Sequence, residues 1–207
     1  MTESERPTGS APESAQSFEA AYVAGRPPWD IDRPQPAFRE LADQGRVVGR
    51  VLDVGCGTGE HALMAAALGL EATGVDTAGT AIATAQRKAG ERALQARFLV
   101  WDALDMAGLG ERFDTVLDCG LFHVFDDAAR ARFVDALHAS LVAGGAYHLL
   151  CFSDQEPGDW GPRRIRQEEI RASFGEGWRV EAIEPARLEV TLDPGSVHAW
   201  RASIRRR

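Results

Sequence analysis

Cysteine is scarce in this chain, which holds only three among its 207 residues, at positions 56, 119 and 151. An odd number cannot pair completely, and small secreted folds that depend on disulfides carry many more. Each cysteine lies in or beside an apolar stretch typical of a buried strand, where a reduced thiol packs as a small hydrophobic group. These features exclude a disulfide framework and a zinc site, and they predict a cytoplasmic protein that binds no metal.

Long apolar runs are also missing. No stretch approaches the roughly 20 residues that cross a membrane, and no leader signal opens the chain. Positive charge is in deficit, because 23 Lys and Arg face 31 Asp and Glu, which gives a formal net charge of −8. A protein with that charge repels nucleic acids and anionic membrane surfaces. We therefore expect neither a nucleic acid nor a membrane as a partner.

Composition divides the chain into three parts. Residues 1–16 hold Ser, Thr, Glu and Pro with almost nothing apolar, which predicts a disordered tail. Residues 17–49 begin with a short helical pattern and continue through four prolines, which forbid a helix and favour a stiff extended path. Residues 50–207 suffice for one packed domain of ordinary size.

Short apolar runs alternate with helical patterns in residues 50–207. The expected strands are residues 51–54, 71–76, 97–102, 113–119 and 146–152, followed by a terminal antiparallel pair at 178–190 and 197–204. Helices are expected at residues 38–44, 62–68, 78–88 and 165–174, and from a cap at Asp126 to Gly144 and Gly145. This alternation predicts an α/β fold with a doubly wound, mostly parallel sheet of seven strands. Such sheets bind ligands at the carboxyl ends of the strands.

The first strand of this domain runs directly into a turn with three alternating glycines, Gly55, Gly57 and Gly59. Glycines let the backbone approach a ligand closely, and the helix that follows offers unpaired N–H groups and a positive dipole end. The pattern predicts a site for a small polar or anionic ligand, with a tight turn that binds nothing as the alternative. A dinucleotide fingerprint would have its third glycine where this chain has Glu60.

Three carboxylates, Asp53, Asp76 and Asp102, fall at the ends of three successive strands. In an open α/β sheet these ends border one crevice, so we expect the three side chains to converge. Asp76 follows Gly59 by about the length of one helix and its returning strand, where a carboxylate can accept hydrogen bonds from both hydroxyls of a ribose. The same placement would serve NAD, so Asp76 does not distinguish between cofactors.

The run from Val51 to Gly59 resembles motif I of the class I S-adenosylmethionine (SAM)-dependent methyltransferases, and residues 113–123 resemble motif IV. The resemblance implies a Rossmann-like methyltransferase fold with SAM as cofactor. In that family the loop wraps the methionyl part of SAM, the residue matching Asp76 binds the ribose, and the residue matching Asp102 accepts from the adenine amino group. For Asp102, a helix or loop cap is the alternative. The expected SAM contacts in this domain are Asp53, Gly55, Cys56, Gly57, Gly59, Asp76, Thr77, Asp102, Ala103 and Cys119.

Pro28-Trp29-Asp30, followed by Arg33-Pro34, resembles the N-terminal segment of thiol, halide and thiopurine methyltransferases. In those relatives the tryptophan matching Trp29 packs over the cofactor. We therefore expect residues 17–49 to form a lid in which Trp29 contacts SAM, and an equal alternative is that Trp29 caps the edge of the sheet. The Asn/Asp-Pro-Pro-aromatic motif of nucleic-acid amino-methyltransferases is absent after the fourth strand, which again argues against nucleic acid.

Methyl transfer from a sulfonium requires donor and acceptor in line and water excluded, but no strong acid or metal. A thiol supplies its own anion near neutral pH, whereas a phenol or a ring N–H would benefit from an imidazole. His123, just past the fourth strand, is the candidate general base, with capping or stacking as its alternative. Tyr22, Phe122 and Phe125 are candidates for an apolar acceptor pocket, and His61 is expected to face solvent.

We therefore predict an enzyme that transfers a methyl group from SAM to a small, largely apolar acceptor. A thiol sulfur is favoured, ahead of nitrogen or oxygen of a heterocycle or phenol. Two alternatives stay open, an NAD(P)-dependent oxidoreductase and a SAM-binding regulator without catalysis. The oxidoreductase would bind a nicotinamide cofactor, and the regulator would bind SAM tightly without turnover. The sequence fits a monomer or a homodimer equally.

Overall fold

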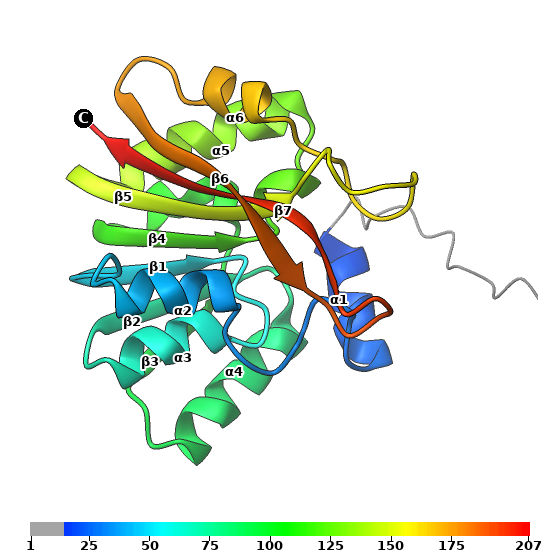
Figure 1. Cartoon of the computed structure of the whole chain (residues 1–207). Helices are drawn as coiled ribbons and strands as arrows, with labels where there is room; N and C mark the ends of the chain where they lie inside the picture. The colour runs from blue at the N-terminus through cyan, green and yellow to red at the C-terminus, as the bar shows by residue number, and fades with distance from the viewer. Residues whose placement is uncertain (1–14) are drawn as a thin grey trace, which may run out of the picture.

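The computed structural model describes residues 15–207, and seven strands form one sheet in the order β3-β2-β1-β4-β5-β7-β6 (Figure 1). The strands are β1 (Arg50–Val54), β2 (Glu71–Asp76), β3 (Ala96–Val100), β4 (Phe113–Cys119), β5 (Leu141–Phe152), β6 (Trp178–Glu189) and β7 (Ser196–Arg206). The helices are α1 (Ala15–Ala24), α2 (Pro36–Asp43), α3 (Glu60–Ala67), α4 (Gly79–Glu91), α5 (Asp127–Ser140), α6 (Gln167–Ser173) and two 3-10 helices, η1 (Ala103–Leu109) and η2 (Phe122–Val124). The predicted disordered tail lies outside the described residues, except that Ala15 and Gln16 begin α1.

Strands β1 to β5 run parallel, and β7 lies antiparallel between β5 and β6. The chain enters the sheet at β1, moves outward through β2 to β3, and returns to β4 on the other side of β1. Doubly wound sheets bind their ligands at such a change of direction, beside the carboxyl ends of the two central strands. The structure confirms the doubly wound, mostly parallel sheet and the antiparallel pair at the end of the chain.

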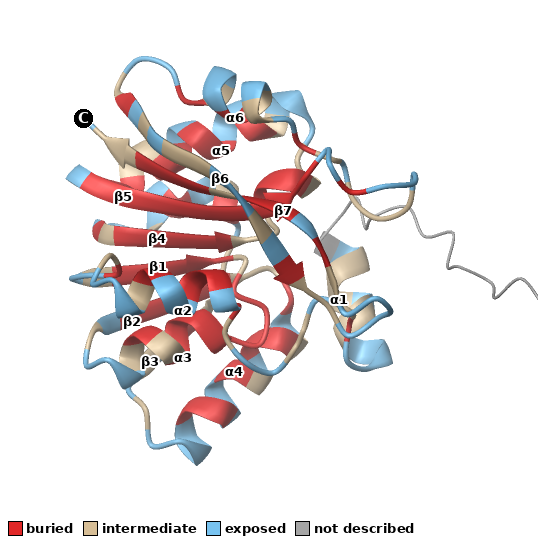
Figure 2. Cartoon of the chain, in the orientation of Figure 1, coloured by how far each residue is buried: buried red, intermediate tan, exposed pale blue. Residues whose placement is uncertain are grey.

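The central strands are buried on both faces, which explains their nearly unbroken apolar runs (Figure 2). Alternate residues enter two separate cores, so that Leu52 and Val116 lie in one core while Val51 and Leu117 lie in the other. Helices α2, α3 and α4 cover the core that contains Val51, and η1, α5 and α6 cover the opposite one. Both layers hold the strands firmly, which fixes the positions of the loops at their carboxyl ends.

Strand β5 differs from the prediction, because it begins at Leu141, directly after α5 ends at Ser140. The expected helix end at Gly144 and Gly145 is therefore wrong. These glycines lie within β5, at a shift in its register with β4, and Gly144 has a φ of 79°. The Ser140 hydroxyl donates to the carbonyl of Ala136 in the last turn of α5. A glycine pair signals a bulge as readily as a helix end, and here the sheet uses it for the bulge.

Residues 25–35, called the strap below, contain neither helix nor strand, as their prolines predict. The strap is fastened to the hairpin of β6 and β7. The side-chain amide of Gln35 donates to the carbonyl of Glu189 and accepts from its N–H, at 3.0 and 2.9 Å. The N–H of Thr191 donates to the carbonyl of Pro28 at 2.8 Å. The strap is therefore held against the hairpin both at Pro28 and at Gln35.

Candidate active site

The glycine loop joins β1 to α3, and its glycines have left-handed backbones, with φ of 65° at Gly55, 52° at Gly57 and 84° at Gly59. Residues with a β-carbon rarely adopt such angles, so the loop depends on glycine. Beneath the loop, the Asp53 carboxylate accepts a hydrogen bond from the N–H of Ala62 at 3.1 Å. Asp53 is only 1% exposed. The structure therefore gives Asp53 a role as support of the loop, and its direct contact with SAM stays a prediction.

The Asp76 carboxylate at the end of β2 is bound to the loop. Its Oδ2 accepts from the N–H of Gly57 and its Oδ1 from the N–H of Ala78, both at 2.8 Å. Burial is the main cause that raises the pKa of Asp76. Each oxygen has a further lone pair, so the carboxylate can still accept from ribose hydroxyls. Cys56 is buried, and its N–H donates to the carbonyl of Val75.

Asp102 is the next carboxylate along this edge. It is exposed and accepts from a backbone N–H two residues on, at 2.9 Å, so it caps η1 as the alternative interpretation expected. The N–H of Trp101 donates to the carbonyl of Asp76 at 3.0 Å, which places the ends of β2 and β3 side by side. Thr77 is half-buried and Ala103 is buried. A contact of Asp102 with adenine stays a prediction.

Tyr22 of α1 lies against the glycine loop, and Trp29 of the strap packs on Tyr22; the contact of Trp29 with SAM stays a prediction. The indole N–H of Trp29 donates to the Tyr22 hydroxyl at 3.0 Å, and the two rings meet edge to face. That hydroxyl lies 2.5 Å from where Gly57 would carry a β-carbon. Burial, and next the charge of Asp76, raise the pKa of Tyr22. The structure places this side chain over the loop, and its place in an acceptor pocket stays a prediction.

The concavity at Gly57 provides a test of whether SAM fits here. A β-carbon at Gly57 would fill this concavity. Glycine leaves it open to a polar group from outside the loop, and the Tyr22 hydroxyl occupies that place here. The Asp76 carboxylate lies directly beside it. A backbone cradle next to a carboxylate suits a cofactor that carries a charged amino acid group and a ribose. The residues present therefore fit SAM.

The end of β4 is organised by a buried carboxylate that the sequence analysis missed. Asp118 accepts from the N–H of Leu121 at 2.8 Å and from the hydroxyl of Tyr147 at 2.7 Å. Burial raises the pKa of Asp118 to about 7. An acidic residue inside an apolar strand is the signal that identifies it in hindsight. Next to it, Cys119 and Gly120 are half-buried at the edge of the sheet, and burial raises the pKa of the Cys119 thiol.

His123 is 8% exposed, and its Nδ1 accepts a hydrogen bond from the N–H of Phe152 at 3.0 Å. Nδ1 therefore carries no proton, and in the neutral ring the proton is on Nε2. Burial, and next the positive charge of Arg130, lower the pKa of His123 to about 3. The predicted general base is thus wrong for this geometry, because the basic nitrogen is occupied by the backbone. The alternative role, a histidine in the wall of the site, is the one observed.

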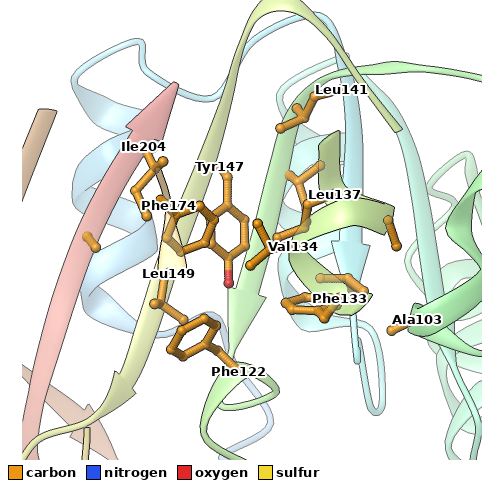
Figure 3. Close-up of a cluster of buried hydrophobic side chains, with 14 of the residues drawn as sticks. Ala103, Phe122, Phe133, Val134, Leu137, Leu141, Tyr147, Leu149, Phe174 and Ile204 are labelled. Carbon is orange, nitrogen blue, oxygen red and sulfur yellow. The ribbon is translucent and has the colours of Figure 1, made fainter. Parts of the chain in front are cut away.

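Phe122 is a core residue, which corrects its assignment to the acceptor pocket. Its ring is fully buried, stacked on Phe174 at 6.0 Å, with the Arg130 guanidinium 4.6 Å above it. Figure 3 shows it among the buried side chains around Tyr147. The half-buried ring of Phe125 packs on Phe133 at 5.0 Å, and its place in a pocket stays a prediction.

His61 is buried, which corrects the expectation that it faces solvent. Its Nε2 accepts from the N–H of Gln35 at 3.2 Å, and its Nδ1 lies 3.8 Å from the Asp53 carboxylate. The imidazole therefore connects Gln35 of the strap to Asp53, the residue that supports the glycine loop. Nothing in the local pattern predicts this contact, because it depends on how the strap returns across the sheet.

The chain is similar to known methyltransferases. A family model described as a methyltransferase domain matches residues 51–145. The 2-heptyl-1-hydroxyquinolin-4(1H)-one methyltransferase of Mycobacteroides abscessus is 37% identical, over 85% of this chain and 82% of its own. The probable thiol methyltransferase 2 of Arabidopsis thaliana is 26% identical, over 87% of this chain and 80% of its own.

A solved structure from work on the conversion of a disulfide bond into a thioacetal group during echinomycin biosynthesis is also similar, with 38% identity, a TM-score of 0.84 and 93% of each chain covered. Within residues 15–207 there is no helix long and apolar enough to span a membrane. Membership of this family excludes both alternatives that the sequence left open, an oxidoreductase and a regulator without catalysis. The chain belongs to the class I SAM-dependent methyltransferases and is an enzyme that methylates small molecules.

Proposed function

We propose that this enzyme methylates a small, largely apolar acceptor at an atom that ionises near neutral pH, with a thiol sulfur favoured over the oxygen or nitrogen of a heterocycle or phenol. The hydrogen bond from the Phe152 N–H to His123 Nδ1 carries this proposal. It occupies the basic nitrogen of the imidazole at the end of β4. An acceptor that arrives as its anion has no need of that base.

The similar proteins support the same chemistry. One acts on a hydroxyquinolone, one is named as a probable thiol methyltransferase, and one was solved in work on a disulfide that becomes a thioacetal. These names include sulfur and hydroxylated heterocycles, and none of them includes a nucleic acid. They favour a reactive heteroatom on a small molecule, and they leave its identity to experiment.

The chain's own part is to bind, to orient and to keep water out. Asp76 and the backbone of the glycine loop would hold the ribose and the methionyl group, and the Tyr22–Trp29 pair would cover them. SAM supplies an electrophilic methyl group on a positively charged sulfur. Alignment and exclusion of water are the main sources of acceleration for such a displacement.

We expect the acceptor to be bordered by side chains around Phe152, the last residue of β5, called the wall after β5 below. Phe152 meets His123 edge to face at 6.1 Å and Trp160 at 5.7 Å. The Arg164 guanidinium lies 5.5 Å above the Phe152 ring and donates to the carbonyl of Glu156. Phe152 itself is only 3% exposed, so we expect an apolar ring to pack against the half-buried Trp160, with the positive charge of Arg164 favouring an anion nearby.

A panel of acceptors tests the proposal. Benzenethiols and phenols with graded pKa, an aliphatic thiol and an N-hydroxyquinolone would be assayed by formation of S-adenosylhomocysteine across pH 5–9. The acid limb of kcat/KM should follow the acceptor's own pKa and move from one acceptor to the next. An inflection at one fixed pH for every acceptor would indicate a base on the protein and contradict the proposal.

A further inference from the structure

Lys88 of α4 is a buried cation with three partners on three different segments. Its Nζ lies 2.7 Å from Oδ1 of Asp32 in the strap and 2.8 Å from Oε1 of Glu60 at the start of α3. It donates to the hydroxyl of Thr58, inside the glycine loop, at 2.9 Å. The Lys88 side chain is only 8% exposed. One ammonium group therefore joins the strap, the loop and α4.

Glu60 does not depend on Lys88 for its counter-charge. The guanidinium of Arg92 donates to both of its carboxylate oxygens, at 2.7 and 2.8 Å. A bidentate pair of this kind satisfies a buried carboxylate well. Lys88 also connects α4 to Asp32 in the strap, whereas the second ion pair of Asp32, with Arg26 at 3.7 Å, stays within the strap. The hydrogen bond from Lys88 is the main cause that lowers the pKa of Asp32.

The strap backbone at Asp32 has a φ of 57°, which residues with a β-carbon seldom adopt. The N–H of Asp32 donates to Oδ1 of Asp30 at 3.0 Å, and the other oxygen of Asp30 accepts from the Thr58 hydroxyl at 3.0 Å. The contacts therefore run from Lys88 through Thr58 to Asp30, which is the neighbour of Trp29. Trp29 in turn holds the Tyr22 hydroxyl above the loop.

We propose that Lys88 is a positioning residue that latches the strap to the glycine loop, so that the loop and its Tyr22–Trp29 cover reach their SAM-binding arrangement together. The proposal rests on the glycine loop as the SAM site and is independent of the acceptor. A Lys88 that only stabilised the packing of α4 on α3 would act through Glu60 and leave the strap unaffected.

Asp32→Asn is the most direct test, because Asn is nearly isosteric, tolerates a positive φ and leaves Lys88 paired with Glu60. In the protein without ligand, hydrogen exchange at the amides of residues 25–35 should become faster. The dissociation constant for S-adenosylhomocysteine, measured by calorimetry, and the KM for SAM should each rise about threefold, the scale of losing one charge from an ion pair whose Asp32 side chain is 54% exposed. The kcat at saturating SAM should stay within about twofold of the wild-type value.

Lys88→Met should have effects at least as large, because it also removes the contacts of Nζ with Thr58 and Glu60. The double variant should be no worse than Lys88→Met alone, because without Lys88 the Asp32 carboxylate has already lost the partner that Asp32→Asn tests. Arg87→Gln is the matched control, since it removes an exposed ion pair with Glu91 one residue earlier in α4 and should change none of these readouts. Wild-type exchange in the strap and wild-type SAM affinity in Asp32→Asn would overturn the latch, even if Lys88→Met failed to fold. Calorimetry with S-adenosylhomocysteine needs no acceptor, so a wrong acceptor class cannot cause that result.

Discussion

The carboxylate of Asp76 accepts a hydrogen bond from the N–H of Gly57, with 2.8 Å between Oδ2 and the nitrogen. This bond joins the end of β2 to the centre of the glycine loop. The glycine loop and the acidic end of β2, which are separate in the sequence, are thereby joined in the structure. The carboxylate orients the loop, and the loop in turn fixes the carboxylate for a ribose. The same pair also explains why removal of Asp76 would disturb more than one contact with SAM.

Asp76→Ala should weaken the binding of S-adenosylhomocysteine by about 1.5–3 kcal/mol, the scale of hydrogen bonds to a charged group. Calorimetry would give the dissociation constant. Glu71→Ala is a suitable control, because Glu71 begins the same strand at its opposite end and is exposed. An unchanged dissociation constant in Asp76→Ala would show that Asp76 does not contact the bound cofactor.

Gly57→Ala should abolish tight SAM binding, because the new methyl group would lie 2.5 Å from the Tyr22 hydroxyl and fill the cradle. Gly69→Ala is the matched control, since Gly69 also has a positive φ, of 78°, but no atom within 4 Å of the added carbon. Both variants carry the backbone cost of about 1–2 kcal/mol. Equal SAM affinity in the two variants would show that the cradle at Gly57 is not used.

The arrangement of the strands and the meeting of the glycine turn with Asp76 were predictable, because both follow from local patterns. Val51 to Gly59 specifies a buried strand and a glycine turn, and strand order then brings Asp76 and Asp102 to the same edge. These features depend on the backbone, which the period of apolar residues and the glycines determine.

Side-chain directions were not predictable in the same way. His123 lies beside the site, as expected, but the return of β5 places the Phe152 N–H on its basic nitrogen. Tyr22 and His61 both take their places from the strap, whose path depends on contacts far along the chain, such as that of Gln35 with Glu189. Such contacts leave no trace in local periodicity, so the roles assigned from spacing alone needed correction.

His123→Asn should leave the pH profile of kcat/KM for any one thiol unchanged. The amide oxygen of Asn can replace Nδ1 as the acceptor for the Phe152 N–H, so the wall after β5 should persist. A ring whose pKa is held at about 3 cannot titrate between pH 5 and 9. Steady-state kinetics with one benzenethiol would check this, and loss of the acid limb in the variant would restore His123 as a base.

Asp118 should make the stability of the fold depend on pH. Burial raises its pKa to about 7, above the roughly 3.9 of a carboxyl group in an unfolded chain. Between about pH 4 and pH 7 the folded state therefore keeps a proton on Asp118 that the unfolded state has lost. The contribution of this group to the free energy of unfolding is complete below about pH 4 and is lost as the pH rises to about 7.

Asp118→Asn removes that dependence while the fold keeps its hydrogen bonds. The amide oxygen can accept from the N–H of Leu121, and the amide N–H can donate to the hydroxyl oxygen of Tyr147, which rotates its own proton away. Denaturant unfolding at pH 5 and pH 8 should show the variant gaining stability relative to the wild type as the pH rises, by on the order of 2 kcal/mol. Asp135→Asn, at an exposed position of α5, should show no such gain. A difference between Asp118→Asn and the wild type that stays constant with pH would mean that Asp118 is ionised throughout this range, held by its backbone donors more strongly than burial opposes it.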